Sequence, residues 1–208
     1  MALSAVWKVR LCVVWSMVCG ALWRPAGAGS VGNERRSWHG RRSLLHELAV
    51  GRGGDLHKWR KIKPAKVVGI DLSASNLESS KQGACARYIN ESKKVKLPPA
   101  LFLQADMTQS LMLQENRYLK MLNKQEPATT PYLEQFVGLT EFDVVSCQFA
   151  IHYACESEET FRKFVGNLTA HCKGTFFGTC MDGAAVYALL LNKQTHIFRA
   201  DNQVYGEV

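Results

Sequence analysis

Cysteine is scarce in this sequence, and its scarcity limits the kind of fold that the chain can adopt. Seven cysteines among 208 residues are too few for a small domain held together by disulfides, and their number is odd. No two of them have the C-x-x-C spacing that is typical of structural zinc sites. We therefore expect no metal centre.

Long apolar runs and internal repeats are also missing. The apolar stretch from Leu11 to Trp23 is about 13 residues long, too short to cross a bilayer as a helix, so we expect no stable membrane span. The absence of a repeat excludes a collagen-like or coiled-coil fibre. Hydrophobic residues make up 47% of the chain and charged residues 21%, which is typical of a folded globular domain and excludes a mostly disordered one.

Acidic residues are nearly absent from the first third of the chain. Residues 1–66 contain 13 lysines and arginines and only three acids, a net charge of +10, whereas residues 67–208 have a net charge of −2. A basic segment on a near-neutral body indicates an anionic partner, with nucleic acid as the first candidate. A targeting segment or a disordered arm would give the same pattern, so charge alone leaves both interpretations open.

The first 43 residues have the layout of a secretory signal followed by a linker. Lys8 and Arg10 precede the apolar stretch, and small residues follow at 26–30, as they do before a signal cleavage site. Residues 30–43 are polar, basic and without periodicity. We expect residues 1–43 to lie outside the fold, either as a signal segment or as sequence from an alternative exon or upstream reading frame.

From residue 44 onward, predicted strands alternate with predicted helices. The predicted strands are 44–49, 66–71, 101–103, 142–147 and 175–179. The predicted helices are 55–63, 73–90, 156–171 and 183–193. Residues 109–141 begin helical and turn irregular around two prolines, which indicates an insertion packed on the domain surface. The alternation predicts an α/β fold, a mostly parallel sheet with helices on both faces.

Five strands leave the sheet with an open edge, and the chain then ends in polar sequence. Exposed edges promote aggregation, so a sheet of this kind normally has further strands. We therefore expect residues 44–208 to form an incomplete domain whose last strands are missing.

Polar and glycine residues follow the predicted strands at one edge of the sheet. A glycine-rich turn, 51–54, comes after the first strand, and Asp71 ends the second strand twenty residues after Gly51. Asp106 ends the third strand and Gln148 follows the fourth. Glycines allow close approach of the backbone to a ligand, and a carboxylate after the second strand can accept bonds from ribose hydroxyls. This set predicts a nucleotide-type cofactor.

The start of the first helix bears on which cofactor is bound. A dinucleotide site requires G-x-G-x-x-G with the pyrophosphate at the helix N-terminus, but here Asp55 occupies that place and would repel it. This favours a neutral or cationic ligand, such as a sulfonium, over NAD. A nicotinamide-dependent dehydrogenase is therefore a poor alternative.

Three segments carry a resemblance to a known family. Residues 50–59, VGRGGDLHKW, resemble the G-C-G-K-G-G-D-L-x-K-W glycine motif of eukaryotic mRNA cap guanine-N7 methyltransferases. Residues 142–153, FDVVSCQFAIHY, are similar to the F-D-x-x-S-C-Q-F-x-x-H-Y signature of the same family, and 174–179 match its fifth strand. The resemblance covers about residues 48–195 and implies a Rossmann-like, class I fold that uses S-adenosylmethionine.

The resemblance also implies site residues. For the cofactor they are Ala49, Gly51, Asp71 at the ribose, Asp106 at the adenine, Gln148 and Tyr153. For the cap and RNA they are Arg52, Asp55, Lys58 and His152. Guanine N7 has a free lone pair and the sulfonium is a good leaving group, so we expect no catalytic acid or base, only alignment and electrostatics.

The implied partners are the capped 5′ end of mRNA and, beyond it, a capping enzyme or polymerase. The family implies a nuclear protein, whereas the N-terminal segment imitates a secretory signal. Arg60, Lys61 and Lys63 can bind the RNA backbone or form a solvated helix end, and we expect Trp59 to have a packing role.

Some positions depart from the family pattern. Ala49 replaces the first glycine of the motif and Glu47 replaces the aspartate of the first strand. An N-x-W-x-K-like segment with a cofactor-binding lysine is missing from 1–46. Two alternatives therefore stay open, a small-molecule methyltransferase of the same fold and an inactive, truncated product.

Overall fold

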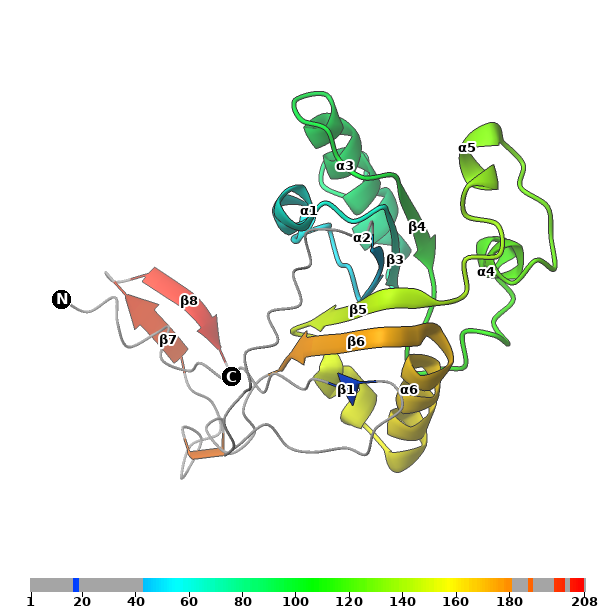
Figure 1. The fold of residues 1–208 in the computed structure, drawn as a ribbon. Coiled ribbons are helices and arrows are strands. Elements are labelled where there is room, and N and C mark those ends of the chain that lie inside the picture. Colours follow the sequence, from blue (N-terminus) through cyan, green and yellow to red (C-terminus); the bar gives the residue numbers. More distant parts are fainter. Residues whose placement is uncertain (1–16, 19–42, 181–186, 189–196, 201–202, 208) are drawn as a thin grey trace, which may run out of the picture.

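A sheet of six strands forms the centre of this protein, as a computed structural model shows (Figure 1). The structure describes residues 17–18, 43–180, 187–188, 197–200 and 203–207. In spatial order the strands are β4 (Ala100–Gln104), β3 (Lys66–Asp71), β2 (Leu44–Leu48), β5 (Phe142–Gln148), β6 (Cys172–Thr179) and β1 (Met17–Val18). All neighbours are parallel except β1, which pairs antiparallel with β6.

Helices cover both faces of the sheet (Figure 1). On one face lie α1 (Leu56–Ile62), α2 (Ala74–Glu78) and α3 (Ala84–Ser92). On the other lie α4 (Arg117–Leu122), α5 (Pro131–Glu134), the 3₁₀ helix η1 (Ile151–Cys155) and α6 (Glu158–His171). The predicted α/β class, with a largely parallel sheet between two helical layers, is confirmed.

The central strand β2 divides the core because its side chains alternate between the two faces. Leu45 packs with Trp59 under α1, whereas Leu48 packs with the cluster that contains Phe164 of α6. The same alternation places Glu47 on the α1 face and His46 on the opposite one. Strand β2 has neighbours on both edges and helices over both faces, so two titratable side chains are buried here.

The single helix predicted at 73–90 is wrong, because the structure has two helices there. Ser73 caps α2, and its hydroxyl accepts the Asn76 N–H. The chain then turns, and α3 begins after Gly83. A Cβ at Gly83 would lie 2.6 Å from the Leu77 carbonyl oxygen, so only glycine fits the tight approach between the two helices.

The segment 109–141 is also placed differently from the prediction. It does not lie on the surface as an insertion, because Leu111, Met121 and Phe136 are buried in the core that contains α6. The irregular part supports α5, where Thr130 caps the helix and Pro131 occupies its first turn. The segment thus completes one of the two helical layers.

The C-terminal residues form strands where only polar sequence was expected. Strand β7 (Ile197–Ala200) pairs antiparallel with β8 (Gln203–Glu207) in a separate two-stranded sheet. Ile197, Phe198, Val204 and Tyr205 in these two segments are residue types that favour strands. Of the predicted helix 183–193, only 187–188 are described and these are helical.

Most of the N-terminal segment, 1–16 and 19–42, lies outside the described residues. Its separation from the fold stays a prediction, although Met17 and Val18 pair with Phe176 and Thr175 at the β6 edge. Within the part of the chain that the structure describes, no helix is long and apolar enough to cross a membrane.

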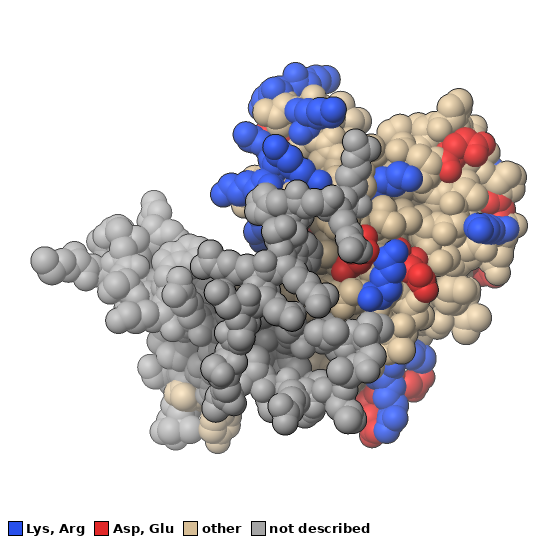
Figure 2. Space-filling view, in the orientation of Figure 1, with Lys and Arg blue, Asp and Glu red and all other residues tan. Residues whose placement is uncertain are grey.

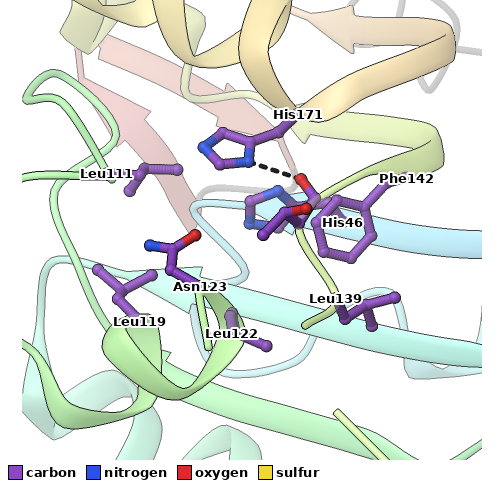
Figure 3. Close-up of a pocket in the computed structure, with 9 residues that line it drawn as sticks. His46, Leu111, Leu119, Leu122, Asn123, Leu139, Phe142 and His171 are labelled. Atoms are coloured by element: carbon purple, nitrogen blue, oxygen red, sulfur yellow. Dashed lines mark hydrogen bonds between the residues drawn. The ribbon is translucent and has the colours of Figure 1, made fainter. Parts of the chain in front are cut away.

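A small cavity lies at the edge of the sheet where the strands begin (Figure 3). It is lined by His46, His171, Phe142 and Asn123, with leucines from the 109–141 segment. The His171 Nδ1 lies 2.7 Å from the Thr140 carbonyl oxygen. No described residue hydrogen-bonds either ring nitrogen of His46 or the Nε2 of His171. Because it is opposite the edge where the strands end, this cavity is not the candidate site.

Burial lowers the pKa of His46 to about 3, and the neighbouring His171 adds to the shift. His46 is therefore neutral in the folded protein down to low pH but charged in the unfolded chain below about 6.5. The unfolded state binds the extra proton between these values. It follows that His46 does not lower the free energy of unfolding above pH 6.5. Below that value the free energy of unfolding falls, and it continues to fall as the pH approaches 3.

We expect His46→Leu to flatten the acid side of the stability profile. The wild-type free energy of unfolding should fall by up to about 1.4 kcal/mol per pH unit from this group alone, and the variant should lack that slope. Urea unfolding at several pH values between 3 and 7 measures it. The exposed His57→Gln serves as control and should keep the wild-type profile, and an unchanged slope in His46→Leu would contradict the assignment.

Candidate functional site

The carboxyl ends of the four central parallel strands meet at one rim of the sheet. Leu48 of β2 is in register with Ile70 of β3 on one side and with Cys147 of β5 on the other. Residues that follow these strands therefore come together in space. The predicted cofactor residues all belong to this rim: Ala49 and Gly51 after β2, Asp71 at the end of β3, Asp106 after β4, Gln148 at the end of β5, and Tyr153 in η1.

The loop after β2 is built from left-handed backbone conformations. Ala49, Gly51 and Gly53 have φ values of 54°, 56° and 72°. The Val50 N–H donates to the Ile70 carbonyl at 2.8 Å, which keeps the loop in line with β3. A Cβ at Gly51 would meet no atom within 4 Å, so the space above this backbone is open to a ligand. At Ala49 the same conformation is strained because its Cβ crowds the backbone.

The Asp71 carboxylate joins this loop to β3. Its Oδ2 accepts the Gly51 N–H at 2.7 Å, and its Oδ1 accepts the Ser73 N–H at 2.9 Å and the Asn76 side-chain amide at 3.1 Å. Three donors fix the side chain, which is 6% exposed. A carboxylate has about four acceptor positions, so Asp71 retains capacity for a ligand hydroxyl.

A buried carboxyl group lies beneath the loop. Glu47 accepts the indole N–H of Trp59 at 2.7 Å, and both side chains are buried. Burial, with the nearby Asp55 charge adding to it, raises the pKa of Glu47 to about 8, although the Trp59 bond opposes the shift. Glu47 is thus largely a neutral acid near pH 7. The packing role expected for Trp59 is confirmed.

Asp106 and Gln148 are held by neighbours on the rim. The Asp106 Oδ1 accepts the backbone N–H and the hydroxyl of Thr108 at 2.8 and 2.7 Å. The Gln148 side chain donates to the Ser146 hydroxyl at 3.0 Å and accepts from Thr179 at 3.2 Å. Both polar groups are therefore oriented within the protein.

Two exposed apolar side chains on the rim were missed by sequence reasoning. Leu72 follows Asp71 and is 66% exposed, and Phe149 follows Gln148 and is 69% exposed. Phe149 has a φ of 55°, and its N–H donates to the Thr179 carbonyl at 2.8 Å. A bulky residue in this conformation is a true outlier, and such outliers concentrate at functional sites. Each follows directly after an acidic or amide residue at a strand end, and this position was the sequence signal that could have indicated a place on the rim.

The four predicted cap-contacting residues fall on two elements. Arg52, Asp55 and Lys58 belong to the loop and α1, whereas His152 lies in η1. The Arg52 guanidinium donates to Gln82 Oε1 at 2.8 Å. His152 packs on the Tyr153 ring, with the ring centroids 4.2 Å apart.

Asp55 lies at the start of α1, close to Lys58. Asp55 occupies the N-cap position of α1, but its side chain makes no cap hydrogen bond. Its carboxylate instead pairs with Lys58 at 2.7 Å. The acid and the base thus neutralise each other beside the loop.

The strand order and the ligand rim define a Rossmann-like, class I methyltransferase fold. The family model for the mRNA (guanine-N(7))-methyltransferase domain matches residues 33–207, most of the chain. The chain therefore belongs to the mRNA cap guanine-N7 methyltransferase family.

Relatives of known name agree with this membership. The chain is 31% identical over 165 residues to mRNA cap guanine-N(7) methyltransferase 1 of Oryza sativa subsp. japonica and 29% identical over 163 residues to the protein of that name from Arabidopsis thaliana. Each match covers 76% of this chain and 38% of the relative. A solved methyltransferase structure from Clostridium acetobutylicum aligns with 77% of this chain and 51% of its own, at a TM-score of 0.46 and 16% identity.

We expect Ala49→Gly to stabilise the protein by about 1 kcal/mol. A left-handed backbone costs an L-residue roughly 1–2 kcal/mol, and the greater freedom of glycine in the unfolded chain offsets part of the gain. Denaturant unfolding measures the change. The matched control is Ala150→Gly, where φ is −135° and the same substitution should destabilise. Destabilisation by both would show that the Ala49 conformation is not strained.

We expect the free energy of unfolding of Glu47→Gln to fall less than that of the wild type as the pH rises from 5 to 8. The folded protein holds a proton on Glu47 up to about pH 8, whereas the unfolded chain releases it near 4.5, so the wild type loses stability as the pH rises between these values. Glutamine keeps an oxygen acceptor for Trp59 and does not titrate. Unfolding at pH 5 and 8 measures the difference, with the exposed Glu134→Gln as control. An identical pH dependence in Glu47→Gln and wild type would overturn the assignment.

Proposed function

We propose that this chain transfers a methyl group from S-adenosylmethionine to N7 of the guanine that caps mRNA. The observation that carries the proposal is the Asp71 carboxylate, fixed by Gly51 at 2.7 Å on the rim of a chain that belongs to this family. The matched segment spans 38% of each plant relative, so the proposed activity rests on the residues present in this chain.

The rim suits an adenosine-containing ligand. Asp71 has acceptor capacity for ribose hydroxyls, and the open backbone at Gly51 allows close approach. Asp106 is placed after the next strand for the adenine amino group, with Leu72 and Phe149 as exposed apolar surfaces for the ring. Gln148 and Tyr153 complete the cofactor side from β5 and η1. The roles of Gly51, Asp71, Asp106, Gln148 and Tyr153 are those that the family pattern implies, and those of Leu72 and Phe149 are added from their exposure.

The chemistry requires alignment and no proton shuttle. S-adenosylmethionine supplies an activated methyl group when bound, and guanine N7 attacks with a lone pair that is free near neutral pH. The chain's residues then have to orient the two reactants and exclude competing geometries. Glu47 is a neutral acid that accepts the Trp59 indole N–H, and it transfers no proton in the reaction.

The cap side of the site consists of Arg52, Asp55, Lys58 and His152. Arg52 supplies positive charge for the triphosphate and is exposed where it can exchange its Gln82 bond for a phosphate oxygen, whereas Lys58 can contact a phosphate only by leaving the Asp55 carboxylate. His152 and Tyr153, packed together, offer an aromatic face for the guanine. Partners of the proposed enzyme are the capped 5′ end, a capping enzyme or polymerase, and the compartment is the nucleus.

A second candidate, an inactive protein that keeps the methyltransferase fold, is favoured by Ala49. A left-handed alanine at the first position of the glycine motif places a methyl group where the family has none, and this weakens cofactor approach. The chain would then keep the fold without turnover. A small-molecule methyltransferase, the remaining alternative, would bind the cofactor without methylating a cap.

We expect the full chain to bind S-adenosylmethionine and to methylate RNA that begins with GpppG. Asp71→Asn should weaken cofactor binding about tenfold or more, because a charged hydrogen bond contributes about 1.5–3 kcal/mol and each tenfold is 1.4 kcal/mol. Calorimetry measures the affinity, and mass spectrometry of the nuclease-released cap measures 7-methylguanine.

Glu134→Gln is the matched control, an exposed carboxylate on α5 that should leave both readouts unchanged. Thermal unfolding verifies that Asp71→Asn is folded. Binding without cap methylation would support a small-molecule substrate. A folded wild type that does not bind the cofactor would contradict the proposal and support the inactive form. Ala49→Gly would then test whether the loop conformation alone prevents cofactor binding.

A further inference from the structure

A strongly basic surface covers one helical layer of the protein. Figure 2 shows lysine and arginine side chains gathered over the region of α1 and α3, whereas basic and acidic side chains lie side by side over the opposite part of the visible face. We call it the α1–α3 basic surface and define it by six exposed residues: Arg60, Lys61, Lys63, Lys93, Lys94 and Lys96.

The charge on this surface is not balanced locally. Glu91 contacts both Arg60, at 3.5 Å, and Lys94, at 3.8 Å. Within the described part of the chain, no carboxylate lies within 4.0 Å of the Lys61, Lys63, Lys93 or Lys96 ammonium groups. One acid therefore serves two of the six basic groups and leaves four without a counter-charge.

The cations of α6 show the contrasting arrangement. Arg162 pairs with Glu158 at 2.6 Å and Lys163 with Glu159 at 2.7 Å, each one turn away on the same helix. Such pairs are the ordinary pattern of a solvated helix face. Ion pairs within one helix therefore account for the α6 cations, whereas the α1–α3 basic surface has unpaired positive charge that is available to an external anion.

The surface is continuous with the candidate site. Arg52 of the glycine loop is tied to α3, because the Arg87 guanidinium donates to the Arg52 carbonyl at 3.0 Å. Helix α1 starts beside the loop and runs seven residues, about 10 Å, away from the rim. Its end, near Lys63, lies shortly before β3 begins, and Lys96 lies shortly before β4 begins. The positive charge thus extends from the rim to the opposite edge of the sheet.

We infer that the α1–α3 basic surface binds the phosphate backbone of the RNA downstream of the cap. The inference rests on the proposed function, which places the cap at the rim, from which the exposed Arg52 and Arg87 lead to this surface. An extended row of unbalanced lysines suits a polyanion that leaves the rim, because lysine contacts phosphates as a point charge without reading the base sequence. A short anion, such as the cap triphosphate, would need only the residues of the rim.

Two consequences separate this role from cap recognition. Affinity should rise with RNA length beyond the cap, and it should depend strongly on salt. For single strands the logarithmic salt slope is about −0.7 for each phosphate neutralised, so removing three contacts should reduce the slope by about 2.

The test compares two triple variants of the full chain with equal change in charge. The first is Lys61→Gln, Lys63→Gln and Lys93→Gln on the basic surface. The control is Arg162→Gln, Lys163→Gln and Lys173→Gln, whose parent residues are ion-paired. Fluorescence anisotropy with a GpppG-capped 15-nucleotide RNA, the same RNA uncapped, and the GpppG dinucleotide is followed between 50 and 200 mM salt.

We expect the first variant to bind both 15-nucleotide RNAs about tenfold more weakly at 50 mM salt, with a slope shallower by about 2. Its affinities for GpppG and S-adenosylmethionine should equal those of the wild type, and the control should bind every ligand as the wild type does. Equal loss in both triple variants would reduce the effect to net charge and overturn the inference. Unchanged RNA binding by the first variant would overturn it too and leave an acidic protein partner for this surface.

The failures of the two proposals are distinguishable. If the wild type neither binds S-adenosylmethionine nor methylates the cap, the proposed function fails even where RNA binding still depends on the three lysines. If methylation of GpppG proceeds and RNA length makes no difference to affinity, the proposed function stands and the RNA path fails.

Discussion

The hydrogen bond from the Gly51 N–H to the Asp71 carboxylate is the contact on which the geometry of the site depends. It joins the loop after β2 to the end of β3, twenty residues later in the chain, at 2.7 Å. The loop that makes this contact has left-handed conformations at Ala49, Gly51 and Gly53, which suit glycine and strain Ala49. Because the carboxylate is also held by Ser73 and Asn76, the acceptor is oriented before any ligand arrives.

The parallel sheet brings the remaining rim residues to the same place without direct contacts between them. Asp106 and Gln148 are each fixed by their own neighbours, Thr108 and Thr179. Each can therefore vary without disturbing Asp71. The glycine loop also starts the helix from which the basic charge extends, so one segment of about fifteen residues links the proposed cofactor and RNA contacts.

Sequence reasoning recovered what depends on local periodicity and on topology. The strands ending at Asp71 and Gln148 were predicted within a residue or two, since β-branched runs bounded by polar residues are strong signals. The break before α3 was missed although Ser79, Ser80 and Gly83 are weak helix formers, and the close approach of Gly83 to Leu77 is part of the turn. Burial of Phe136 was missed because a proline-rich segment has no helical period to indicate a buried face. Exposure of Phe149 depends on a backbone angle that no sequence pattern specifies.

The alternation of β2 has a consequence for the protons that folding moves. His46 and Glu47 are neighbours in sequence, lie on opposite faces of the sheet, and are both neutral in the folded protein across most of the range between their pKa values of about 3 and about 8. Near pH 5.5 the unfolded chain has a charged imidazole and a charged carboxylate at these positions. Folding then amounts to an internal proton transfer from one residue to the next, with no net exchange with solvent. The heat of folding from this pair is accordingly independent of the buffer there, and becomes buffer-dependent on either side.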